Sequence, residues 1–157
     1  METMYEACKL MQNDAIVGME YLLDIASKNI EQLSDSQMWQ QATARNDSIG
    51  NIVLHIVDNF KEWILYRLSK LSSNGDVLVD ISFSKTKKKK DIIDLLEKTI
   101  KMSCKIIGNI PAENIYKKII LKNDEVTIGD AVLMTISHMD IHVGQIQRIA
   151  EDILKDS

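Results

Sequence analysis

The chain has 157 residues and a formal net charge of −4, with 45% hydrophobic and 27% charged residues. This length suits one domain over residues 1–157, and the acidic balance disfavours a general nucleic-acid binder, which needs a basic face. No run of about 18 apolar residues occurs, so the sequence predicts no membrane span and no membrane partner. One proline and six glycines provide few tight turns, which favours an all-α over an all-β fold.

Two features indicate the compartment. The first ten residues, METMYEACKL, lack the basic region and apolar segment of a secretory signal. Cys8 and Cys104 fit neither a CxxC motif nor a disulfide framework. We therefore expect reduced, buried or half-buried thiols in a cytoplasmic protein.

The first half of the chain predicts two long helices. Apolar residues at spacings of three, four and seven predict the first helix over residues 3–32. The segment 34–39 interrupts this period and predicts a short capped turn. The second helix begins after Ser48, which suits an N-cap, and its apolar stripe extends to about Leu71.

A long connection follows before the third helix. The sequence SSNGD at 72–76 is a turn signal, and residues 77–83 alternate weakly as an extended segment would. The run KTKKKK at 85–90 predicts a solvated loop rather than an anion or nucleic-acid contact, because one basic run in an acidic chain is weak support for binding. An apolar stripe then predicts the third helix over residues 88–109.

The last part of the chain predicts a connection and a fourth helix. Residues 112–126 are a connection of uncertain form, in which NIYKKIIL at 114–121 suits either a strand or an irregular helical turn. Thr127 is the expected N-cap of a helix that extends to about Ile153, with Asp130 at the position of a capping box. The whole pattern predicts a four-helix bundle with a long connection between helices 2 and 3.

The starts of the second and fourth helices resemble each other. SIGNIV at 48–53 and TIGDAV at 127–132 share a cap, an isoleucine and a glycine at equal offsets. Two similar caps explain this as well as an internal duplication does, and we favour the caps.

Two histidines stand four residues apart in the predicted fourth helix. His138 and His142 share a helical stripe with Thr135 and Gln145, which we expect to face inward, whereas Asp140 falls on the outer side. Histidines at i and i+4 lie one above the other, where both imidazoles reach a single ion. Ordinary hydrogen-bonded core histidines are the alternative for such a pair.

The third histidine strengthens the metal interpretation. His55 lies seven residues after Ser48, among core positions of the second helix, so we expect all three histidines of the chain to project inward. Three neutral imidazoles in an apolar bundle lack partners unless a divalent ion, Zn²⁺ or Ni²⁺, binds them. Three protein ligands leave a position open for water or substrate. Asn59 and Gln145, each one turn beyond a histidine, either orient a ligand or simply extend a polar layer of the core.

The same residues resemble a known family. SIGNIVLHIVDNF and TIGDAVLMTISHMDIHVGQIQRIAE resemble the second-helix and last-helix motifs of the DinB-like superfamily of four-helix bundles, and LSDSQMW resembles the turn before its second helix. The resemblance implies a metal held by His55, His138 and His142. It also implies a homodimer. Some members are metal-dependent thiol S-transferases or isomerases that use a low-molecular-weight thiol, some are linked to stress responses, and many have no known reaction.

Two functions remain open from the sequence. One is an enzyme, a thiol S-transferase or a related transferase or hydrolase, in which the metal lowers the pKa of a thiol or water for attack on a small-molecule substrate. The other is a non-catalytic, metal-stabilised, stress-associated bundle. No strong general base is present, and Asp58 is a weak candidate. Met38, Trp39 and Trp63 suit either a dimer interface or the core.

Overall fold

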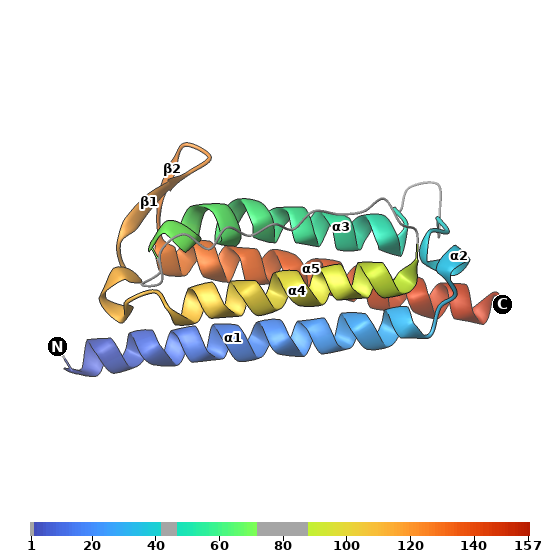
Figure 1. The fold of residues 1–157 in the computed structure, drawn as a ribbon, viewed down its shortest axis with the longest axis horizontal. Helices are drawn as coiled ribbons and strands as arrows, with labels where there is room; N and C mark the ends of the chain where they lie inside the picture. Colours follow the sequence, from blue (N-terminus) through green and yellow to red (C-terminus); the bar gives the residue numbers. More distant parts are fainter. Residues whose placement is uncertain (1, 42–46, 72–87) are drawn as a thin grey trace.

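The computed structural model describes residues 2–41, 47–71 and 88–157. Its long helices, α1 (Glu2–Glu31), α3 (Ile49–Phe60), α4 (Lys89–Gly108) and α5 (Ile128–Lys155), form an elongated bundle (Figure 1). Helices α1 and α3 each pack on both α4 and α5. The prediction of an all-α four-helix bundle is therefore confirmed.

Figure 1 also shows the direction of the helices. Helices α3 and α4 run the same way along the bundle, and α1 and α5 run the opposite way, so α3 and α4 need the long connection that we predicted. The predicted turn at 72–76, the extended segment at 77–83 and the first residues of the basic run at 85–90 lie outside the described residues. Of that run, Lys89 and Lys90 belong to α4.

Side-chain caps fix where three helices begin. The hydroxyl of Ser48 accepts a hydrogen bond from the Asn51 amide at 3.2 Å, at the start of α3. Thr127 accepts from the Asp130 amide at 3.0 Å, and its own amide donates to the Asp130 carboxylate at 3.2 Å, so the predicted capping box of α5 is complete. The short predicted turn is α2 (Asp35–Met38), also with a capping box. These bonds satisfy amides that the first turn of a helix leaves without partners.

The second predicted helix ends where expected but is not α-helical throughout. After Phe60 the chain continues as a π-helix, η1 (Lys61–Leu68), and then as a 3₁₀ turn, η2 (Ser69–Leu71). The π-helix buries Trp63 among its apolar residues. Such segments are rare and are frequent at functional sites. Apolar spacing does not distinguish a π-helix from an α-helix over two turns, which is why the sequence did not predict it.

A small hairpin lies at one end of the bundle, with its tip projecting beyond α3 (Figure 1). After the 3₁₀ turn η3 (Ala112–Asn114), strand β1 (Lys118–Leu121) pairs antiparallel with β2 (Asp124–Thr127), and Ile119 lies opposite Val126. Lys122 and Asn123 form the two-residue turn with φ of 49° and 78°, the left-handed conformation that such turns need. The strand alternative is thus confirmed for Lys118–Leu121, whereas β2 lies beyond the segment for which we predicted it.

The burial of individual side chains bears on several other predictions. Cys8 is buried, Cys104 is half-buried, and neither forms a disulfide, as predicted. Met38 and Trp63 are buried, so core packing accounts for them without a dimer interface. Among the described residues, no helix has both the length and the apolar character needed to cross a membrane.

Candidate metal centre

The histidines lie at the edge of the core, not inside it. The buried face of α5 is centred on residues such as Val132, Met139 and Val143. His138 and His142 lie to one side of that face and are half-buried, and His55 on α3 is exposed. The expectation that all three project into an apolar interior is therefore wrong. The larger apolar residues set the rotation of both helices, and the histidines occupy the groove between α3 and α5.

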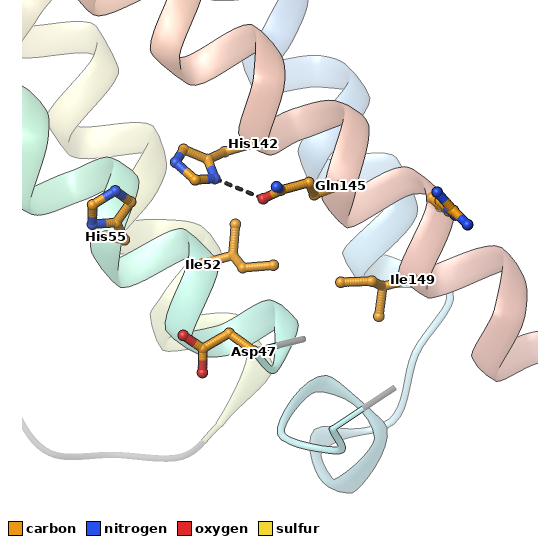
Figure 2. A pocket seen from close by; sticks show the side chains of 7 residues that line it. Asp47, Ile52, His55, His142, Gln145 and Ile149 are labelled. Atoms are coloured by element: carbon orange, nitrogen blue, oxygen red, sulfur yellow. Dashed lines mark hydrogen bonds between the residues drawn. The ribbon is translucent and has the colours of Figure 1, made fainter. Parts of the chain in front are cut away.

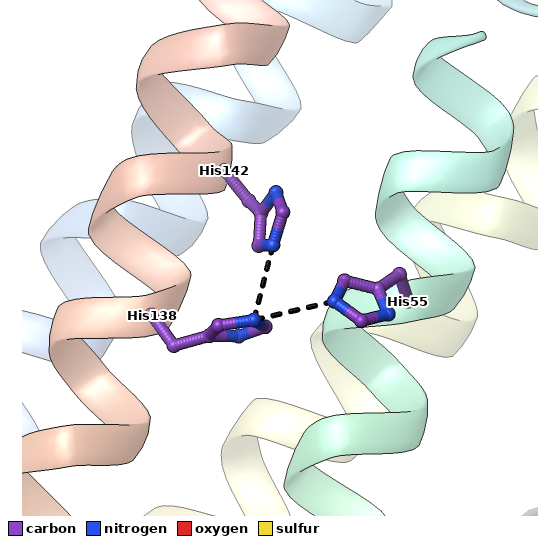
Figure 3. Close-up of side chains that lie close together, drawn as sticks. All are labelled: His55, His138 and His142. Atoms are coloured by element: carbon purple, nitrogen blue, oxygen red, sulfur yellow. Dashed lines mark hydrogen bonds between the residues drawn. The ribbon is translucent and has the colours of Figure 1, made fainter. Parts of the chain in front are cut away.

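The groove nevertheless brings the three imidazoles together. His55 and His142 face each other across it (Figure 2), and His138 completes a triangle of rings (Figure 3). Nε2 of His138 lies 3.2 Å from Nε2 of His55 and 3.1 Å from Nε2 of His142. One ring nitrogen from each histidine lies within 4.8 Å of the others. Three nitrogens from two helices therefore converge on one point.

Hydrogen bonding alone does not satisfy this arrangement. Each imidazole Nε2 carries either one proton or one lone pair, so Nε2 of His138 makes at most one linear hydrogen bond with its two close neighbours. At least one close nitrogen pair is then left without a good hydrogen bond. A tetrahedral cation with Zn–N bonds of about 2.0–2.1 Å separates its nitrogen ligands by about 3.3 Å. The two separations from His138 are close to that value, and the third pair of nitrogens lies within 4.8 Å, so the donor set fits a divalent cation.

Gln145 fixes the orientation of one ring. Its side-chain oxygen Oε1 lies 2.8 Å from Nδ1 of His142 (Figure 2). With the amide in this orientation, Oε1 only accepts, so Nδ1 of His142 carries the proton and donates it. The lone pair of His142 is then on Nε2, which faces the other two histidines. Gln145, three residues after His142 on α5, thus leaves Nε2 of His142 as the atom that can bind a cation.

A small cavity, here called the inner cavity, lies beside the ring of His138. It has a volume of about 150 Å³ and lies between the hairpin, α3, η1 and α5, lined by residues that include Asn59, Trp63, Lys122 and His138. Nδ1 of His138 and Oδ1 of Asn59 are both buried and have no hydrogen-bond partner among the described residues. Burial, followed by the charges of His142, His55 and Lys122, lowers the pKa of His138 from its ordinary value. This favours the neutral ring, the form that binds a metal.

A larger outer cavity opens on the other side of the cluster. It has a volume of about 570 Å³ and begins at His55, His142 and Gln145. Ile52, Ile149 and the charged side chain of Asp47 also line it (Figure 2), as does Arg148. Cavities of this size hold small molecules. The histidine cluster is thus accessible to a ligand from outside.

The structure also places the other predicted site residues. Asp140 is exposed on the outer side of α5, as expected, and Asp58 is exposed as well. Asn59 and Gln145 both lie beside the cluster. Sequence reasoning missed Asp47, Lys122 and Arg148. Arg148 follows Gln145 by three residues, a helical signal that was available, whereas Lys122 reaches the inner cavity only through the hairpin.

These features define a four-helix bundle with a three-histidine centre in the groove between α3 and α5. The chain belongs to the family described as "Protein of unknown function (DUF1572)", whose model matches residues 7–157.

One solved structure shares this fold. The crystal structure of the conserved protein of locus from Enterococcus faecalis superimposes with a TM-score of 0.70 and 12% sequence identity. The match covers 91% of this chain and 96% of the other. A comparison with functionally curated proteins finds no match.

Proposed function

We propose that the protein binds a divalent cation, Zn²⁺ or Ni²⁺, through His55, His138 and His142, as a DinB-like protein. The observation that carries this proposal is the convergence of three imidazole nitrogens within 4.8 Å. Imidazole is a suitable ligand for both metals. Three protein ligands leave room for an additional ligand, which supports a reactive rather than a purely structural centre.

The reaction that we infer is a metal-dependent thiol S-transfer, or a related transfer or hydrolysis, on a small-molecule substrate. A bound divalent cation supplies Lewis acidity, which lowers the pKa of a thiol or water and yields a nucleophile at neutral pH. The chain's own residues position the metal-binding groups and the second ligand. Gln145 holds the ring of His142, and the walls of the outer cavity position the second ligand. The resemblance to the DinB-like superfamily, some of whose members are thiol S-transferases, supports the reaction class by fold-level analogy.

A non-catalytic role has its own support. His55 belongs to α3, whereas His138 and His142 belong to α5, so a cation bound by all three links two helices. A ligand that binds only the folded chain raises its stability. We therefore keep a metal-stabilised, stress-associated bundle as the alternative. A cytoplasmic homodimer is expected for either function.

Metal analysis tests the centre directly. Protein purified without a histidine tag and loaded with Zn²⁺ or Ni²⁺ should retain about one ion per centre, as three-ligand sites do. His138→Ala should abolish retention. Asp140→Asn changes an exposed residue of the same helix and should leave retention unchanged. Retention near zero in the unmodified protein would contradict the proposal.

Two measurements separate the enzyme from the stabilised bundle. Turnover of low-molecular-weight thiols with several electrophiles should appear with bound metal and disappear after chelation. Thermal unfolding with and without metal measures the structural contribution. A large shift in Tm without any metal-dependent turnover supports the non-catalytic alternative.

A further inference from the structure

Helix α5 has an exposed apolar face on its outer side. Leu133, Met134 and Ile141 are large apolar side chains of this helix, and each is at least half exposed. They line a groove that extends from Val126 of the hairpin to His138. Exposed apolar residues that gather in one groove mark a surface for another molecule.

The residues along this face follow a heptad spacing. Alternating steps of four and three residues connect six exposed positions, here called the α5 seam: Asp130, Met134, Ser137, Ile141, Gly144 and Arg148. This is the spacing of the contact positions in a coiled coil of two helices. Arg148 follows Asp130 by eighteen residues, about five helical turns, so both ends of the seam face the same direction. The seam therefore fits one straight partner helix.

The charges of the seam are complementary to a reversed copy of itself. When two such helices pair antiparallel about a two-fold axis at the middle of the seam, residues at equal distances on either side of the middle meet. Asp130 then meets Arg148 of the partner subunit, and the symmetry forms this ion pair twice. One oxygen of Asp130 accepts the Thr127 amide, whereas the other oxygen and Arg148 have no partner among the described residues.

The sizes of the other seam residues are complementary as well. In the same register Met134 meets the partner's Gly144, and Ile141 meets the partner's Ser137, so a large side chain faces a small one in each layer. A Cβ on Gly144 would meet nothing within 4 Å among the described residues. Because glycine is unfavourable inside a helix, the single chain gives no reason for it here. Close approach of a second helix supplies one.

Helix α1 provides a comparison with the same spacing. Its exposed series is Leu10, Asp14, Val17, Tyr21, Asp24 and Lys28. Antiparallel pairing about the middle of that series places Asp14 against Asp24 of the partner subunit, so like charges meet. Asp24 is also bonded to Lys28 of its own helix. The face of α5 is therefore self-complementary, whereas that of α1 is not.

We propose that two copies of the chain associate antiparallel through the α5 seam. This inference rests on the homodimer expected with the proposed function and names its surface. A second copy in the groove also borders His138 of the metal centre. The seam spans only about 27 Å of helix. Because this is small for an interface, the dissociation constant should be about micromolar rather than nanomolar.

Sedimentation velocity between about 1 and 500 µM protein measures this dissociation constant. Ile141→Glu introduces a charge into the middle of the seam from both subunits and should raise the constant by about 100-fold. Val17→Glu is the matched control, because Val17 and Ile141 are both 63% exposed but Val17 lies on α1. It should leave the constant unchanged, and circular dichroism verifies that both variants fold.

Gly144→Gln separates association from folding. Glutamine favours a helix more than glycine does, so this variant should resist urea better than the unmodified chain when both are monomeric. In the dimer the longer side chain occupies the space of the facing helix, so association should weaken. A variant that is more stable yet dissociates would not be explained by damage to the fold.

Exchange of charges between subunits tests the register. Arg148→Glu places a carboxylate against Asp130, and Asp130→Lys places an ammonium against Arg148, so each variant alone should dimerise about tenfold more weakly. A mixture of the two variants restores opposite charges at both ends of the seam. It should form heterodimers with about the dissociation constant of the unmodified protein.

Three results would overturn the inference. One is unmodified protein that stays monomeric over the whole concentration range. Another is equal weakening by Ile141→Glu and Val17→Glu, and the third is a charge-exchange mixture that associates no better than its components. Metal retention is a separate measurement, because monomeric Gly144→Gln should still bind the cation. If the seam variants dissociate as expected but no variant retains metal, the metal centre fails and the dimer surface stands.

Discussion

The side-chain oxygen of Gln145 lies 2.8 Å from Nδ1 of His142, on the same face of α5. Because this oxygen accepts a hydrogen bond from Nδ1–H, the lone pair of His142 lies on Nε2, which is 3.1 Å from Nε2 of His138. A metal-binding histidine whose outer nitrogen donates to such a partner has a fixed ring and a more basic donor atom.

Gln145→Leu should weaken metal binding by about 10- to 100-fold, because Nδ1 of His142 loses its acceptor. The stability of the metal-free protein should change by less than about 0.5 kcal/mol, since Gln145 is exposed. Competition with a chelator of known affinity measures the first effect, and urea unfolding measures the second. Gln145→Glu keeps an acceptor and should restore binding. Gln147→Leu, an exposed site on the same helix, serves as the control, and an equal loss there would argue against a specific role for Gln145.

Asn59→Leu should separate metal affinity from stability. Oδ1 of Asn59 and Nδ1 of His138 are buried, lack described partners and line the same inner cavity, so one polar molecule between them would bridge an acceptor and a donor. Loss of the bridge should weaken metal binding by about tenfold. Asn59 is only half-buried, so replacing its amide by an apolar group of similar size should change the free energy of unfolding by about 1 kcal/mol or less. Calorimetric Zn²⁺ titration and denaturation of metal-free protein check the two effects. A stability loss with unchanged affinity would show that Asn59 is purely structural.

Gly50→Ala should destabilise the protein by about 1–3 kcal/mol, the usual cost of forcing extra atoms into a packed site. An added Cβ would lie 2.6 Å from the indole of Trp39, which packs on this glycine. Gly18→Ala is the matched control, because a Cβ there meets nothing within 4 Å. In the interior of α1 that change should stabilise by about 0.5–1 kcal/mol. Chemical denaturation of both variants gives the comparison, and equal effects of the two would contradict this packing.

Cys104 should make stability fall between about pH 9 and pH 11. Burial, with a smaller contribution from the charge of Glu20, raises the pKa of Cys104 from 9.0 to about 11. Below pH 9 the thiol is protonated in both the folded and the unfolded chain, so it has no effect. Above pH 9 the unfolded chain ionises first and is favoured until the folded pKa is reached. Urea unfolding at pH 8 and pH 10 should show a smaller decrease for Cys104→Ser than for the unmodified protein. Identical decreases would contradict the raised pKa.

The repeated helix starts illustrate what a short motif reports. Ser48 and Thr127 both cap their helices, and Gly50 and Gly129 both lie against a neighbouring side chain. A Cβ on Gly129 would lie 3.0 Å from Met11. Capping and close packing therefore explain the shared offsets, as we favoured from the sequence, without an internal duplication.

The sequence by itself determined the helices and the pairing of two histidines. Hydrophobic spacing and cap residues are local signals, and they located α1, α4 and α5 to within about two residues, the usual spread of helix boundaries. The i, i+4 spacing placed His138 and His142 on one side of α5, because a helix fixes that relation without help from the rest of the chain.

Only the tertiary structure decided where that side of the helix lies. The packing of α3 against α5 brought His55 to the pair and left the cluster in an open groove, because the largest apolar side chains compete for the core and rotate the helices accordingly. The π-helix after Phe60 and the hairpin that brings Lys122 to the inner cavity depend on contacts between distant segments. Local spacing carries no information about such contacts, so the walls of both cavities became visible only in the folded bundle.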